Sequence, residues 1–430
     1  MTGWIHVSVD CGLMPGGLAG EPVTYLVGNI FAVPPATASL REVTLPVGDS
    51  PKPASFEVRP GRYVVEVGLP SGHVLSEDAV VANNDEATVA FDLRDASPYG
   101  SHTLQYLLGN VEPSAAYHSN DEYPATNSRS ARPAVVTGRT PFESTRAGQA
   151  EADILVLDDD RPLAIDALNR LREQSPADAS DAVATLLRVP DPPEPVRAGA
   201  PADLSPIYEV DEWVHSAMPG ALSNRRVYLR LTAGDKSFLA TVPTWESSAV
   251  EILLNLRAGP TGSPVSVAVR SLSWGAALGY LSSGSLHKAA ALFPAEASMR
   301  PEHMDPLVVA ASGYVLVGTR SDDRWEPWGP WLGNLRTGFP TVSDGAVLWG
   351  VHRLQTSRTA EDLDDAREAL LEGYRRGLPV YTLGLAWLMD GLSSFPDDPG
   401  CAEAFQQVRQ LCWQVDMSQP FVVLRLGRQG

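Results

Sequence analysis

The spacing of apolar residues changes along this chain of 430 residues, and the change constrains the fold more than any single motif. Over residues 1–95, apolar and polar side chains alternate, as in EATVAFDL, between turns rich in Gly, Pro, Asn and Asp. After Gly275, apolar residues recur at every third or fourth position, as in AEDLDDAREALLEGYRRG. A period of two is typical of half-buried strands, and a period near 3.6 is typical of helices. The sequence therefore predicts an α+β protein.

Four parts are predicted, because a single core rarely exceeds ~250–300 residues. Residues 1–95 are expected to form an antiparallel β-sandwich. Residues 96–205 are expected to form a linker with a short strand–helix segment, since a stretch poor in apolar residues cannot offset its ordering entropy. Residues 206–275 are expected to be β-rich, with a hairpin at AGDK. Residues 276–430 are expected to form an antiparallel helical domain that ends in a strand, PFVVLRLG.

The charge balance narrows the range of partners and compartments. The net charge is −19, from 52 acidic and 33 basic residues, so neither nucleic acid nor an anionic membrane is an expected partner. The start, MTGWIHVSVD, has no secretory pattern, and the apolar run LVVAASGYVLVG is shorter than a membrane-spanning helix. Three cysteines without CxxC spacing suit a reducing compartment. These features predict a cytoplasmic protein. Arginine greatly outnumbers lysine, as in high-GC bacterial genomes, which predicts a bacterial source.

Patterns that could support catalysis are isolated. Asp158–Asp160 follow an apolar strand, as do the magnesium-binding acids of response-regulator receivers, but a Pro-rich break follows where the receiver should continue. Ser285 and Lys288 fit S-x-x-K without the K-T-G or S-D-N of serine acyl-enzymes. Cys11 and His73 stand in the wrong order for a caspase-like dyad. No zinc-type histidine spacing or glycine-rich phosphate loop occurs. We therefore predict a protein that is not an enzyme and has neither cofactor nor metal; a hydrolase of unrecognised type stays the alternative.

The predicted linker carries arginines among small polar residues, a composition that favours proteolytic cleavage. Arg129, Arg139 and Arg146 are candidate cleavage positions, whereas Pro133 protects the bond after Arg132. The alternative is a solvated loop that no protease uses.

The stretch RWEPWGPWLGNL contains three tryptophans, Trp325, Trp328 and Trp331. Pro330 is expected to occupy the first position of a helix, which places Trp331 in its first turn and the other two rings on an extended lead-in. Large rings in a helical domain usually pack in the core, but the same residues dominate protein interfaces. A structural role is therefore the first interpretation of the three tryptophans. A protein-partner surface formed by Trp325, Trp328 and Trp331 is the second, and a carbohydrate or small-ligand platform is the third.

Two segments resemble known families. FEVRPGRYVVEVGLPSGHVLSEDAVVANNDEATVAFDL resembles the prealbumin-like sandwiches of carboxypeptidase-regulatory and PEGA type, which implies a binding or spacing module. LDDAREALLEGYRRGLPVYTLGLAWLMDGL resembles a tetratricopeptide-type (TPR-like) helical hairpin and is similar to bacterial helical proteins that accompany caspase-like peptidases. That resemblance implies a protein partner, such as a caspase-like protease encoded nearby. We therefore predict an adaptor, regulator or protease target in a bacterial antiviral-defence or stress-response system.

Overall fold

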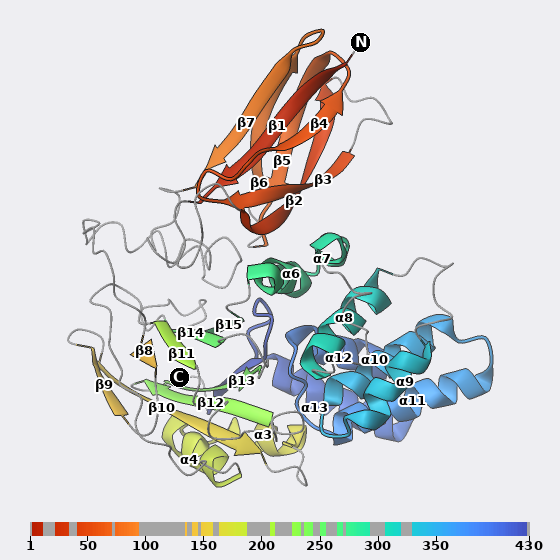
Figure 1. The fold of residues 1–430 in the computed structure, drawn as a ribbon. Helices are drawn as coiled ribbons and strands as arrows, with labels where there is room; N and C mark the ends of the chain where they lie inside the picture. Colours follow the sequence, from red (N-terminus) through yellow and green to blue (C-terminus); the bar gives the residue numbers. More distant parts are fainter. Residues whose placement is uncertain are drawn as a thin grey trace. The chain divides into compact units, whose positions relative to one another are not determined.

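The chain divides into two units (Figure 1). A computed structural model describes residues 2–11, 22–33, 41–70, 74–93, 134–135, 140–144, 148–157, 163–186, 207–210, 226–233, 236–243, 250–254, 265–269, 272–292, 306–319 and 329–427. The first unit comprises Met1–Arg129, Gly259–Gly262 and Ser271–Pro294, and the second unit comprises the remainder. The predicted α+β multi-domain class is confirmed, since each unit combines strands and helices.

The first unit contains a seven-stranded sheet. Its strands are β1 (Gly3–Asp10), β2 (Pro22–Val33), β3 (Arg41–Gly48), β4 (Ala54–Val58), β5 (Gly61–Gly68), β6 (Val74–Val81) and β7 (Glu86–Asp92), in the order β4-β1-β3-β2-β5-β6 with β7 paired to β1. The sheet is mixed rather than purely antiparallel, because β1 pairs in parallel with β7 along most of its length and with β3 at Val9 and Asp10. Along β1, Ile5 and Val7 are fully buried, which agrees with the predicted alternation.

Helices α6 (Leu272–Ser282) and α7 (Leu286–Leu292) pack against β2. The fully buried Tyr280 of α6 donates its hydroxyl proton to the Gly68 carbonyl at 2.6 Å and accepts from the Val27 amide at 3.2 Å. Burial raises the pKa of Tyr280 to about 12. These helices begin the segment predicted as a C-terminal helical domain, but their contacts belong to the first unit.

Replacing Tyr280 by phenylalanine is expected to destabilise the first unit by about 1–3 kcal/mol, because Val27 and Gly68 each lose a buried partner. Urea denaturation, with hydrogen exchange followed on β2 peptides, measures the change. The control is Tyr25→Phe, because Tyr25 lies on β2 and is 46% exposed. This substitution should change the free energy of unfolding by less than about 0.5 kcal/mol. Equal losses in the two variants would contradict an anchoring role for the Tyr280 hydroxyl.

The second unit contains two sheets. The larger has the order β16-β13-β12-β10-β9 and the smaller β15-β14-β11-β8. The strands are β8 (Ala134–Val135), β9 (Thr140–Ser144), β10 (Gly148–Leu157), β11 (Ile207–Val210), β12 (Arg226–Ala233), β13 (Lys236–Val242), β14 (Val250–Leu254), β15 (Val265–Val269) and β16 (Val423–Leu426). The predicted β12–β13 hairpin and the predicted final strand are confirmed, since β13 pairs with both β12 and β16.

Part of the predicted linker belongs to these sheets. Strands β8, β9 and β10 all lie within residues 134–157, and β10 pairs along the whole of β12. The short strand predicted in this region is present as β10, whereas β8 and β9 correct the linker prediction. Strand β8 pairs with the distant β11 and β9 pairs with β10, and local composition did not reveal either pairing.

The helices of the second unit are α3 (Ile165–Leu171), α4 (Pro176–Leu186), α8 (Pro306–Gly318), α9 (Gly329–Gly338), α10 (Ser343–Thr356), α11 (Ala360–Arg375), α12 (Thr382–Ser393) and α13 (Pro399–Cys412). Helix α11 begins with a capping box formed by Thr359 and Asp362. Between α11 and α12, Gly377 has a φ of +89°, and a Cβ there would lie 2.3 Å from the Leu163 carbonyl oxygen. This turn therefore requires glycine.

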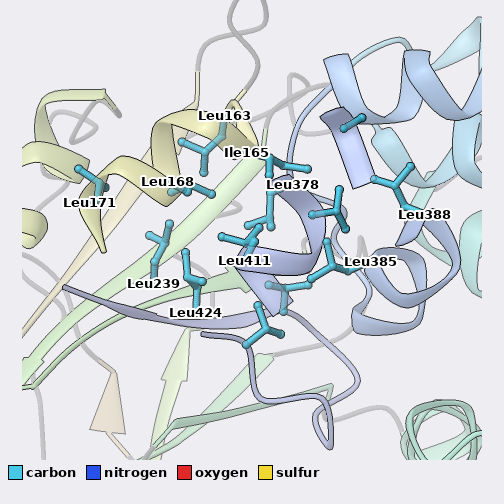
Figure 2. Close-up of a cluster of buried hydrophobic side chains, with 14 of the residues drawn as sticks. Leu163, Ile165, Leu168, Leu171, Leu239, Leu378, Leu385, Leu388, Leu411 and Leu424 are labelled. Atoms are coloured by element: carbon cyan, nitrogen blue, oxygen red, sulfur yellow. The ribbon is translucent and has the colours of Figure 1, made fainter. Parts of the chain in front are cut away.

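A cluster of buried leucines connects the helices to the larger sheet. Figure 2 shows Leu168 of α3 and Leu239 of β13 beside Leu411 of α13, with Leu385 and Leu388 of α12 at the helical side of the cluster. All five side chains are at most 1% exposed. Helices α3, α12 and α13 and strand β13 consequently share one hydrophobic core.

Candidate partner-binding surface

The predicted tryptophan stretch is described in part. Helix α9 begins at Gly329, one residue before the predicted Pro330, so the expected helix start is confirmed within one residue. Trp331 lies in its first turn and is half-buried. Trp325 and Trp328 lie outside the described residues, and the grouping of the three rings stays a prediction.

Two sets of predicted residues also lie outside the described part of the chain. They are the candidate cleavage positions, Arg129, Arg139 and Arg146, and the acidic turn, Asp158–Asp160. His73, the candidate partner of Cys11, also lies outside the described residues. Cleavage of the linker and metal binding at the acidic turn therefore stay untested.

The two remaining catalytic candidates are described. Desolvation, supported by the charge of Asp10, raises the pKa of the buried Cys11 thiol to about 12. Such a shift opposes the thiolate that a cysteine nucleophile needs. Lys288 lies in the first turn of α7, with its ammonium nitrogen 5.7 Å from the centroid of the Tyr280 ring. Its visible role is therefore packing against the ring that anchors α6.

A network of arginines and carboxylates fixes α9 against α11. Arg336 of α9 donates to Glu372 at 2.7 Å and to Asp365 at 3.2 Å. Burial alone would raise the pKa of Glu372, but the hydrogen bond from Arg336 and the charges of Arg376 and Arg336 lower it overall. The carboxylate is therefore ionised at neutral pH, and both ion pairs hold the helix that carries Trp331.

Helix α10 adds an aromatic side chain to this network. The Trp349 indole donates to Asp365 at 3.0 Å, and the Arg353 guanidinium lies 5.6 Å from the Trp349 ring centroid. Arg353 also pairs with Asp362 and Asp365 of α11. Trp349 thus acts as a packing anchor where α9, α10 and α11 meet.

A buried acid, Asp344, connects α8, α10 and the α11–α12 turn. Its carboxylate accepts from the Tyr314 hydroxyl at 2.7 Å and from the amides of Val380 and Tyr381 at 2.8 and 3.2 Å. Burial raises the pKa of Asp344, although these donors oppose the shift. Asp344 is 0% exposed, so a substrate cannot reach it, and we assign it a structural role.

The most exposed large apolar side chain in the described part of the chain is Trp413, at 76%. It follows α13, and Met417, four residues later, is 40% exposed. The segment between them is held against β16, because the Asp416 amide donates to Val423 and the Arg425 amide donates to the Gln414 carbonyl. Trp413 is therefore displayed on an anchored connection.

Sequence reasoning did not identify this tryptophan. The buried face of α13 contains Cys401, Ala404, Val408 and Leu411. These residues recur every three or four positions, so the next inward-facing position of the helix would come after Trp413. This spacing could have indicated that the Trp413 ring faces outward. Exposed aromatic residues of this kind suit contacts with another protein.

The described residues offer neither a metal-binding cluster nor a membrane-spanning helix. They contain no cluster of three or more histidine, cysteine or acidic side chains that could hold a metal ion. None of the described helices has the length and apolar character needed to cross a membrane.

Comparison with known proteins gives one match. Residues 276–423 match the family model of the Y4kD C-terminal domain. No curated protein and no solved structure matches the chain. The match covers about a third of the chain and runs from α6 to the start of β16. The C-terminal helical region is therefore similar to the Y4kD C-terminal domain.

Proposed function

We propose that this chain is a non-enzymatic adaptor or regulator that binds a protein partner through its helical region. The observation that carries the proposal is the 76% exposure of Trp413 on an anchored connection. An exposed indole contributes little to folding, whereas tryptophan is among the residues that contribute most to protein interfaces. Met417 follows Trp413 by four residues and is also exposed, and its flexible apolar side chain is of the kind found at binding surfaces.

Trp331 is a second candidate contact on the same unit. Arg336, on the same helix, fixes α9 through Glu372 and Asp365, so a partner would meet a preordered helix. The half-buried state of Trp331 is compatible with packing and with partner contact.

The proposal extends to a bacterial defence or stress-response system in the cytoplasm. Two resemblances support this extension: that of residues 363–392 to a TPR-like hairpin, and that of roughly residues 300–400 to bacterial helical proteins that accompany caspase-like peptidases. The buried faces of α11 and α12 agree with such a hairpin, since Ala366, Leu370 and Leu385 are fully buried. A caspase-like protease is the proposed partner, and cleavage after Arg129, Arg139 or Arg146 is the proposed consequence if the chain is its target.

Co-expression of the full chain with each protein encoded beside its gene tests the proposal. One neighbour is expected to co-purify in a defined ratio. Trp413→Ala is expected to weaken that complex about 30-fold, the equivalent of a 2 kcal/mol interface residue. Calorimetric titration of the purified proteins measures the affinity.

Leu363→Ala is the matched control, because Leu363 is 42% exposed on α11 and its removal should change affinity less than about threefold. Trp331→Ala reports whether α9 belongs to the same interface. If no neighbour binds, or if Trp413→Ala binds as tightly as the unaltered chain, the proposed interface is wrong.

A further inference from the structure

The outer face of strands β4, β1 and β7 carries an exposed tryptophan between two glutamates. Trp4 of β1 is opposite Glu57 in β4 and opposite Glu86 in β7. Residues that are opposite one another in neighbouring strands point to the same face of a sheet. The buried Ile5 points to the other face, and Trp4 is 41% exposed. The Trp4 ring therefore lies on the outer face with a carboxylate-bearing residue on each side.

A histidine lies beside one of these carboxylates. The Nδ1 atom of His6 lies 2.7 Å from the Ser55 hydroxyl, and its Nε2 atom lies 3.5 Å from the Glu86 carboxylate. If Ser55 donates to Nδ1, the ring proton is on Nε2 and faces Glu86. The Glu86 side chain remains 72% exposed. The Glu86 carboxylate thus lies close to the His6 side chain of β1 and can still accept a hydrogen bond from a ligand.

The described part of the sheet that carries Trp4 is acidic overall. The described residues from 2 to 93 include ten acidic and four basic side chains. Within this described part, Glu57 is exposed and makes no ion pair. A neutral apolar partner covering this face would desolvate the carboxylates of Glu57 and Glu86, and a second copy of a chain with net charge −19 would add like charge.

A cation complements these groups. A guanidinium stacks on an indole face through the cation–π attraction, and its planar N–H groups can reach carboxylates at the ring edge. We propose that Trp4, Glu57 and Glu86, with His6 beside Glu86, form a binding site for an arginine side chain in a basic segment of a protein partner. This site is on the first unit and is independent of the surface around Trp413.

Calorimetric titration of the full chain with an acetylated peptide of alternating glycine and arginine tests the site at physiological salt. Saturable binding is expected, with weaker binding of the lysine analogue and none of the glutamate analogue. Trp4→Ala and the double variant Glu57→Gln/Glu86→Gln are each expected to weaken binding at least about fivefold. The glutamine pair preserves size at exposed positions, so it tests the site even if Trp4→Ala is unstable.

Matched controls separate this site from the overall negative charge. Tyr25→Ala removes an aromatic ring that is 46% exposed on β2. Glu42→Gln/Glu77→Gln removes two exposed carboxylates from β3 and β6. Both should change the affinity less than about twofold if the site is local. Equal loss in the Glu42/Glu77 variant, absence of arginine-peptide binding, or Trp4-dependent binding of a neutral oligosaccharide instead of the peptide would each overturn the proposal.

Discussion

Replacing Asp344 by alanine is expected to destabilise the second unit by roughly 3–5 kcal/mol. The substitution removes the shared acceptor of the Tyr314 hydroxyl and of the amides of Val380 and Tyr381. All three donors are buried, and a buried donor without a partner loses its full desolvation free energy. The loss exceeds the gain from removing a carboxylate whose pKa burial raises. Urea denaturation and hydrogen exchange at the Val380 and Tyr381 amides measure the effect.

The isosteric variant Asp344→Asn separates charge from hydrogen bonding. Oδ1 and Oδ2 of Asp344 both accept from donors, so an asparagine must direct its NH₂ group at one donor. We expect asparagine to destabilise the unit by about 2–3 kcal/mol, less than alanine does. Asp390→Ala, at an exposed position of α12, is the control and should have little effect. If the amides near residue 380 also exchange fast in the Asp390→Ala control, the role assigned to Asp344 is wrong.

Close packing around the same acid explains why a neighbouring position is glycine. A Cβ at Gly384 would lie 2.2 Å from the Tyr314 hydroxyl oxygen and 2.8 Å from Oδ1 of Asp344. Tyr314 also contacts the rings of Tyr381 and Trp387, with centroids 5.6 and 5.2 Å away. The carboxylate is thus enclosed by an aromatic shell that leaves no space for a methyl group.

The elements that the sequence predicts correctly are those defined by local pattern. The β12–β13 hairpin and the α11–α12 hairpin each have their period and their turn within one short stretch. Pro330 likewise indicates the start of α9, because the ring fixes its own backbone angle. In each case, the residues that determine the element are its near neighbours.

The elements that the sequence does not predict depend on distant contacts. Tyr280 anchors α6 by a hydrogen bond to Gly68, 212 residues earlier, and its helical period gives no indication of that partner. Strand β8 is similar, since its partner β11 lies far along the chain. The exposure of Trp413 depends on where α13 ends and how β16 holds the next residues. For this reason, the candidate surface could not be chosen from the tryptophan pattern at Trp325–Trp331 alone.

A buried arginine at the end of α11 is expected to have the second large effect. Arg376 donates to the carbonyls of Phe339 and Val342 at 3.2 and 3.1 Å and to the Arg336 carbonyl at 2.7 Å, and it pairs with Glu372. Its side chain is 10% exposed. We expect Arg376→Ala to destabilise the second unit by about 2–4 kcal/mol, because the carbonyls of Arg336, Phe339 and Val342 each lose a donor, although the Phe339 carbonyl keeps the Val342 amide. Urea denaturation and hydrogen exchange over residues 336–345 measure the loss.

Lysine at this position should recover less than half of the lost stability. Its compact ammonium group keeps the charge, but it cannot reproduce the planar set of N–H groups that serves Phe339, Val342 and Arg336 together. The neighbouring Arg375 is the matched control, since its side chain is 64% exposed and its removal should change stability by less than about 1 kcal/mol. If Arg376→Lys were as stable as the unaltered chain, charge alone would hold the α9–α10 connection. The expected difference instead implies that directed hydrogen bonds keep α9, and with it Trp331, in position.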